Sequence, residues 1–274
     1  QGILRNSMLI ISPILIAAVI FVDFFLKADR YVTFDILDEP VSFGDYLFYL
    51  YGGMKEFIPD HEMGFQLPIV WIIVFFVLPF ILLGYPLKDM NGSGQQILIR
   101  STKRTFWWLS KCCWNILGTL FYHFIMLMTG LVACLVFRID TTSNIHMDFV
   151  KAAFEVGPRE IREISVLFIS TVILPVCVSA SINMLQMTLA IFIKPIFSFL
   201  VISILLLTSA YLMSPLLIGN YAMIFRYTWI LENGVSVEIG YSISLIILFI
   251  SIITGTVRFH FYDILESGQE GENQ

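Results

Sequence analysis

The chain alternates long runs of apolar residues with shorter polar segments, and the length of these runs predicts its elements. The hydrocarbon core of a bilayer is about 30 Å thick, so a helix needs about 20 apolar residues to cross it. Residues 164–225 carry a single charge, Lys194, and are too many for one crossing at about 1.5 Å per residue. Because proline disfavours helical geometry in the residue before it, we expect the chain to turn back at Lys194-Pro195. The six predicted membrane helices are residues 8–26, 67–85, 112–137, 164–193, 195–217 and 239–257.

The composition supports a membrane protein. Of the 274 residues, 58% are hydrophobic and 14% are charged, and the mean hydropathy is +0.84. A soluble globular chain carries about 25% charged residues. We therefore predict an all-α, polytopic membrane protein with a single transmembrane domain over residues 1–258. The four cysteines lie in or beside apolar runs without metal or redox spacing, so we expect them to be packing residues.

Cations predict the orientation, because loops rich in Lys and Arg stay on the cytoplasmic side. Residues 86–111 carry five cations and one acid, which predicts a cytoplasmic segment. Residues 27–66 carry eight acids and three cations, which suits the opposite face. The predicted topology has six helices with both termini in the cytoplasm, extracellular loops at 27–66 and 138–163, and a cytoplasmic tail at 259–274.

The second half of this cytoplasmic segment has helical periodicity. One face of the predicted helix carries residues at steps of four, three and four: Arg100, Arg104, Trp107 and Lys111. One interpretation is an ordinary juxtamembrane helix held at anionic lipid, where each cation contributes about 1 kcal/mol. The other interpretation is a docking site for a second protein.

The order of groups in residues 89–111 is Asp89, Gly92-Ser93, Ile97-Leu98-Ile99, Lys103-Arg104 and Lys111. This order resembles the cytoplasmic loop between helices two and three in permeases of the type-2 family of ATP-binding-cassette (ABC) exporters. There the family typically shows an acid, Gly-Thr, a run of leucines, a Ser-Arg pair and a lysine that opens the third helix. This chain departs from that pattern at Gln95-Gln96 and at Arg100-Ser101.

The resemblance implies a permease whose cytoplasmic segment is a coupling helix, docked on a separate ATPase subunit. It also implies two copies of that ATPase, which bind ATP and Mg²⁺, and a second permease that is either the same chain or a paralogue. The chain has no Gly-x-x-x-x-Gly-Lys-Ser/Thr loop, so we expect it to bind no cofactor and to hydrolyse no ATP by itself. The residues assigned to this coupling segment are Asp89, Gly92, Ser93, Gly94, Gln95, Gln96, Ile97, Leu98, Ile99, Arg100, Arg104 and Lys111.

Polar side chains inside the predicted helices are the other candidates for function. They either line a translocation path or form hydrogen bonds between packed membrane helices. Buried ionisable groups, which ion-coupled carriers use, are almost absent. This favours a transporter that is driven by a partner outside the bilayer. The residues of the possible path are His123, Ser179, Ser181, Asn183 and Gln186.

Together these features predict the permease subunit of an ABC exporter in a bacterial cell membrane, in contact with membrane lipid and without nucleic-acid or metal sites. The Asp60-His61-Glu62 run lacks the spacing of a metal site. The family resemblance suggests a hydrophobic or antimicrobial peptide as cargo, with a drug or lipid next. The alternative is a polytopic membrane factor for peptide immunity or assembly that transports nothing. An enzyme is disfavoured, because no loop brings together an acid, a base or metal ligands.

Overall fold

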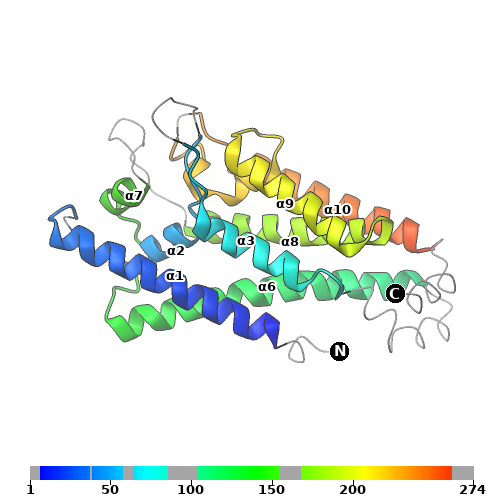
Figure 1. Cartoon of the computed structure of the whole chain (residues 1–274), viewed down its shortest axis with the longest axis horizontal. Helices are drawn as coiled ribbons and strands as arrows, with labels where there is room; N and C mark the ends of the chain where they lie inside the picture. The colour runs from blue at the N-terminus through cyan, green and yellow to red at the C-terminus, as the bar shows by residue number, and fades with distance from the viewer. Residues whose placement is uncertain are drawn as a thin grey trace.

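The computed structural model describes residues 7–37, 39–57, 64–85, 104–154, 168–231 and 233–260. Across these ranges the protein is helical, with two isolated β-bridges and no strand (Figure 1). The all-α prediction is therefore confirmed. The α-helices are α1 (Met8–Thr33), α2 (Phe43–Tyr51), α3 (Ile69–Ile81), α6 (Arg104–Phe137), α7 (Met147–Phe154), α8 (Phe168–Phe192), α9 (Pro195–Tyr211) and α10 (Val237–His260). Two 3₁₀ helices, η2 (Ile218–Ala222) and η3 (Ile224–Arg226), lie between α9 and α10.

Four of these helices, α1, α6, α8 and α10, are long and apolar enough to cross a membrane, so the chain is a helical membrane protein. The other two predicted crossings contain shorter helices, α3 with 13 residues and α9 with 17. Pro68 immediately precedes α3, and Leu212 leaves helical geometry at the end of α9. Six crossings therefore remain a prediction.

Two helices are longer than the apolar runs that predicted them. The first run ends at residue 26, but α1 continues to Thr33. The third run begins at residue 112, but α6 already begins at Arg104. Charged residues ended both runs in the sequence, whereas a helix that leaves the hydrocarbon region can continue with charged side chains because water and headgroups solvate them.

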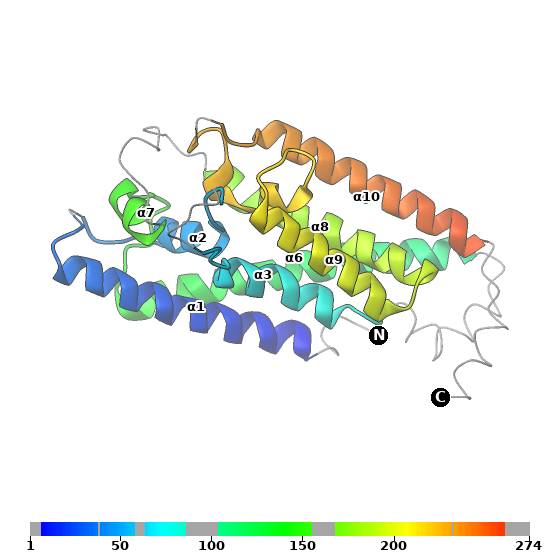
Figure 2. The ribbon, with the colours of Figure 1, turned by 45° about the horizontal axis from the view of Figure 1, so that its top comes forward.

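The helix ends gather at two ends of the bundle. α1 and α6 begin, and α3 and α10 end, toward the same end of the bundle as the turn between α8 and α9 (Figures 1 and 2). We call this the Pro195 end. The opposite end, which we call the α2 end, holds α2, α7 and the connection from α9 to α10. The predicted topology assigns the Pro195 end to the cytoplasm and the α2 end to the exterior.

The central helix is α8, which packs against α10, α6, α9, α3 and α2. Its most apolar window is 72% buried, compared with 33% for α1 and 17% for α10. The outer helices instead expose large apolar side chains, as Val19 of α1 (66%) and Ile253 of α10 (60%) do. Contiguous apolar faces of this kind suit contact with lipid.

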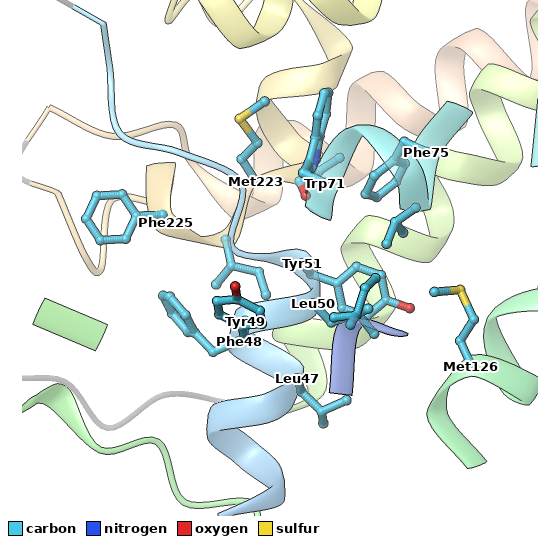
Figure 3. Close-up of a cluster of buried hydrophobic side chains, with 14 of the residues drawn as sticks. Leu47, Phe48, Tyr49, Leu50, Tyr51, Trp71, Phe75, Met126, Met223 and Phe225 are labelled. Atoms are coloured by element: carbon cyan, nitrogen blue, oxygen red, sulfur yellow. Dashed lines mark hydrogen bonds between the residues drawn. The ribbon is translucent and has the colours of Figure 1, made fainter. Parts of the chain in front are cut away.

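The α2 end contains a buried helix that the sequence had placed within an extracellular loop. Every residue of α2 is buried, and its side chains meet Trp71 and Phe75 of α3, Met126 of α6, and Met223 and Phe225 (Figure 3). The helix has only nine residues, too few for the crossing length that guided the prediction. Segment 27–66 is therefore not only a loop, because its middle forms part of the core.

A buried arginine holds the connection from α9 to α10. Arg226 donates hydrogen bonds to the carbonyl oxygens of Ser209 (2.5 Å) and Ala210 (2.7 Å) in the last turn of α9, where helix carbonyls lack intrahelical partners. It also donates to Met54 O at 3.0 Å and to the side chain of Asn220. Burial lowers the pKa of Arg226 to about 10, so the guanidinium stays charged at neutral pH.

Candidate functional site

Most of the predicted coupling segment lies outside the described residues. This holds for the assigned positions from Asp89 to Arg100. The structure begins again at Arg104, which is the first residue of α6. It therefore describes the helix that leads from the coupling segment into the bundle. The candidate site consists of the first three turns of α6 and the residues that contact them.

Lys111 lies among aromatic rings at the Pro195 end. Its Nζ is 5.0 Å from the centre of the Trp107 ring and 5.3 Å from that of Tyr85. Tyr85 stacks on Trp114 with ring centroids 3.8 Å apart. Cation–π contacts of this kind contribute about 0.5–1 kcal/mol where they are exposed. They attach the start of α6 to the segment that follows α3.

The start of α6 is also packed directly on α10. The Trp108 ring lies against Gly255, where an added Cβ would be 2.2 Å from Trp108 Cζ2. Its Nε1 donates a hydrogen bond to Ile252 O at 3.3 Å. Trp107 stacks on Phe259 with ring centroids 4.9 Å apart. Glycine at 255 thus permits a close approach that any side chain would prevent.

These contacts form a small core of their own, which we call the aromatic junction. It joins α6 to α10 through the tryptophans and to α8 through two methionines and an isoleucine. Rings and sulfur side chains pack closely and with favourable contacts. The buried residues of the aromatic junction are Trp107, Trp108, Cys112, Met184, Met187, Ile191 and Phe259.

The residues of the possible translocation path are all buried, and four of them lie on α8. The exposed fractions of His123, Ser179, Ser181, Asn183 and Gln186 are between 1% and 3%. His123 alone is on α6, where its Nδ1 lies 2.9 Å from Tyr51 Oη of α2. The structure thus places His123 among different neighbours from those of the α8 residues.

The α8 side chains bond to backbone carbonyl oxygens, either within α8 or on neighbouring helices. Asn183 Nδ2 donates to Ser179 O at 2.8 Å, and Gln186 Nε2 donates to Pro79 O of α3 at 2.8 Å. Ser181 Oγ lies 2.7 Å from Ser244 O of α10. Hydrogen bonds to neighbouring helices hold packed membrane helices together. The arrangement therefore favours the packing interpretation over a lined path.

Five further buried polar residues lie among these hydrogen bonds, and the sequence analysis did not identify them as candidates. Asn115 Nδ2 donates to Asn183 O at 3.5 Å, and Asn183 Nδ2 lies 3.5 Å from Thr119 Oγ1. The spacing of Asn115 and Thr119 by four residues, which places both on one face of α6, could have predicted them. Among the described residues, the Oδ1 atoms of Asn115 and Asn183 and the Oε1 of Gln186 have no hydrogen-bond partner. The five residues are Asn115, Thr119, Thr188, Ser244 and Ser251.

A carboxylate–histidine pair lies at the α2 end. Asp45 Oδ2 is 2.6 Å from His146 Nδ1, and Asp45 Oδ1 accepts the His146 backbone N–H at 2.7 Å. Burial raises the pKa of Asp45, and the hydrogen bonds from His146 and Ser42 oppose that rise. The Ser42 hydroxyl donates to Asn144 O rather than to His146. The pair therefore fastens the start of α2 to residues 144–146 and presents no nucleophile.

No group of three or more potential metal ligands occurs in the described residues. The Asp60-His61-Glu62 run lies outside them. A metal centre thus finds no support in the part of the chain that the structure describes.

A family profile described as "Protein of unknown function (DUF2705)" matches residues 8–265. The chain belongs to this family. No curated protein and no solved structure matches the chain. The DUF2705 match spans every described helix from α1 to α10, including the aromatic junction and the polar residues of α8. The description of DUF2705 names no function.

Proposed function

We propose that the chain is the membrane-spanning permease subunit of an ABC exporter in a bacterial cell membrane. The single observation that carries this proposal is the aromatic junction. It packs the start of α6, which is the last part of the segment resembling a coupling helix, against both α10 and α8. A displacement of that segment would therefore move three of the four long apolar helices.

The length of α6 supports this mechanical role. It is one continuous helix of 34 residues, which corresponds to about 51 Å at about 1.5 Å per residue. A single helix of that length reaches from the Pro195 end to the α2 end, as Figure 1 shows. A force that acts on the helix at Arg104 is thus transmitted along one continuous helix to the opposite end of the bundle.

Under this proposal the chemistry takes place in the partners. Two copies of a cytoplasmic ATPase bind ATP and Mg²⁺, and this chain is not an enzyme by itself. A second permease, the same chain or a paralogue, completes the path. The cargo is a hydrophobic or antimicrobial peptide, with a drug or lipid as the next choice. The α8 polar side chains are packed between helices, which agrees with transport that is driven by an ATPase outside the bilayer.

Purification of the tagged chain from native membranes tests the proposal. We expect an ATPase to co-purify, and we expect its amount to fall about tenfold or more when Gln95, Gln96 and Leu98 are all replaced by Asp, because buried charges weaken an interface by several kcal/mol. Leu216→Asp is the control, since Leu216 is 88% exposed at the α2 end. Absence of any ATPase, or equal loss in the control, would contradict the proposal.

Labelling with a membrane-impermeant maleimide tests the orientation separately. Cys113 is exposed, so the background variant is Cys113→Ser. Ser93→Cys and Ser101→Cys should react only when the cytoplasmic face is opened, whereas Leu216→Cys should react in intact cells. Reaction of Ser93→Cys from the exterior would contradict the proposal, because a cytoplasmic ATPase could not contact a segment outside the cell.

The second candidate is a membrane factor for immunity or assembly that transports nothing. The bonded state of Ser181 and Gln186 favours it, because these side chains hold neighbouring helices together within one chain. Such a factor should protect cells from its peptide when the Gln95, Gln96 and Leu98 positions are changed to Asp. An exporter with the same changes should not.

A further inference from the structure

A groove of about 550 Å³ lies at the α2 end, between the last turns of α1 and the end of α6. This volume falls within the range of small-molecule sites. The groove is apolar on most of its wall and charged at three positions. The described residues that line it include Phe25, Asp29, Val32, Leu135, Arg138 and Asp140.

The groove lies where two candidate membrane spans end. α1 has 26 residues, about 39 Å at about 1.5 Å per residue, which exceeds a hydrocarbon core of about 30 Å. All charged residues of α1 lie between Asp23 and Arg30, so it is its last turns that reach the headgroup region. Next to the groove, Leu26 of α1 and Leu135 and Val136 of α6 are exposed by 58%, 61% and 70%. The lipid-facing surface of both helices thus continues into the groove wall.

Opposite charges flank this apolar wall. Arg138 follows the last residue of α6 with a positive φ of 59°, and the Ile139 N–H bonds to Cys134 O at 2.9 Å. Arg138 and Asp29 both line the groove and are both exposed, yet neither has an ion-pair partner among the described residues. Asp140 also lines the groove, and its two carboxylate oxygens accept hydrogen bonds from the backbone N–H and the hydroxyl of Thr142.

We propose that this groove binds one phospholipid whose headgroup combines a phosphate with a primary ammonium, as in phosphatidylethanolamine. The Arg138 guanidinium pairs with the phosphate, a geometry that allows two parallel hydrogen bonds. Asp29 and Asp140 accept N–H bonds from the ammonium, which a choline headgroup cannot donate. An acyl chain lies along Phe25, Val32 and Leu135. This site does not depend on the proposed transport function.

A phospholipid suits the groove better than a peptide. One wall belongs to α1 and Leu135 of α6 lines the other, next to side chains that are exposed on the same two spans, so a lipid reaches the groove along these helices without leaving the bilayer. One cation and two carboxylates also complement a zwitterion, whereas an apolar peptide segment would leave Arg138 and Asp29 desolvated and unpaired.

Native mass spectrometry of the purified full chain, with defined lipids added to the detergent, tests this site. Phosphatidylethanolamine should bind in preference to phosphatidylcholine and phosphatidylglycerol. Arg138→Gly should lower the affinity for phosphatidylethanolamine by about tenfold or more, because the phosphate loses hydrogen bonds from a charged donor. Glycine accepts a positive φ more readily than arginine, so this variant should still fold. Arg138→Lys should lose less affinity than Arg138→Gly.

Asp29→Asn should reduce the preference for phosphatidylethanolamine over phosphatidylcholine, because the amide keeps the size of the side chain and removes its charge. The matched control is Arg30→Gln, an exposed cation one residue away that does not line the groove. Equal affinity for the three lipids, or equal losses in Arg30→Gln and Arg138→Gly, would overturn the proposal. So would a photoreactive group at Leu135 that links to a peptide and not to a phospholipid.

Discussion

α8 and α10 lie side by side and are both apolar enough to span a membrane, yet they have opposite environments. The most apolar window of α8 has a mean hydropathy of 1.7 and is 72% buried, whereas that of α10 has 2.1 and is 17% buried. The difference is in how polar and small residues are arranged. α8 carries them all around, and α10 keeps Gly240, Ser244, Ser251 and Gly255 on the buried face.

This difference shows that average hydropathy identifies a membrane helix without locating it in the bundle. Lipid tolerates no unpaired polar group, so a helix with polar side chains on several faces has to be surrounded by other helices. A helix with one face of small residues packs closely through that face and leaves its large apolar side chains in lipid. α8 is therefore the centre of the bundle and α10 lies on its surface.

The largest effect should come from truncating matched aliphatic residues on the two helices. Leu174→Ala on α8 removes a fully buried side chain and should lower the free energy of unfolding by about 2–5 kcal/mol through cavity formation. Ile250→Ala on α10, exposed by 57%, should change it by less than about 0.5 kcal/mol. Thermal unfolding of the detergent-solubilised protein measures both, and equal effects would refute the assignment of α8 as the central helix.

Gly255→Ala on α10 should have the next largest effect. The new Cβ would lie 2.2 Å from Trp108, and overpacking of this kind destabilises by about 1–3 kcal/mol. Ile253→Ala, two residues away and 60% exposed, is the control. Tryptophan fluorescence during unfolding should report the loss of Trp108 packing in Gly255→Ala alone. If the variant unfolds like the native chain, α6 and α10 are not in contact at the aromatic junction.

Asn183→Leu on α8 should destabilise by about 1–2 kcal/mol, because it removes a buried amide that bonds both within α8 and to Thr119 of α6. The variant loses the donor to Ser179 O and the contact with Thr119. Ser242→Leu on the exposed side of α10 bonds only within its own helix and should be almost neutral. A larger loss in Ser242→Leu would mean that α10 does not face lipid there.

The smallest effect distinguishes the two sides of one contact. Ser181→Ala removes a hydroxyl that bonds to Ser244 O and should destabilise by about 0.6 kcal/mol. Ser244→Ala should have no measurable effect, because among the described residues the Ser244 hydroxyl has no hydrogen-bond partner. Chemical unfolding curves of the two variants in the same detergent give the comparison. Equal losses would place a donor on α10 as well.

The pattern of apolar residues was sufficient for the fold class and for a helix in each of six segments. The pattern failed where a helix is buried although it is too short to cross a membrane. α2 has nine residues, so a criterion based on crossing length assigned it to a loop, although all of it is buried. The last turns of α1 were missed for the opposite reason, because charged residues in a helix outside the hydrocarbon region interrupt the apolar run without ending the helix. The start of α6 also lies outside its apolar run, but there the helical periodicity of Arg104, Trp107 and Lys111 predicted a helix.

The candidate site was predictable in composition but not in contacts. Asn183, Gln186 and Ser181 stood out as polar residues in an apolar segment, and they are buried as a group on α8. Their partners could not be inferred, since Pro79 O and Ser244 O are backbone atoms that any residue supplies. The assigned coupling residues from Asp89 to Arg100 lie outside the described residues and stay a prediction.

The sequence alone determined that this protein is helical and lies in a membrane. A long apolar run is stable in lipid, and in lipid its backbone groups have to bond to one another, as they do in a helix. Only the tertiary structure decided that α8 is central, that α2 is buried, and that Trp108 meets Gly255. These contacts join residues more than 100 positions apart in the chain or depend on which face of a helix meets its neighbour. Such choices follow from the packing of all the helices at once, which no single segment encodes.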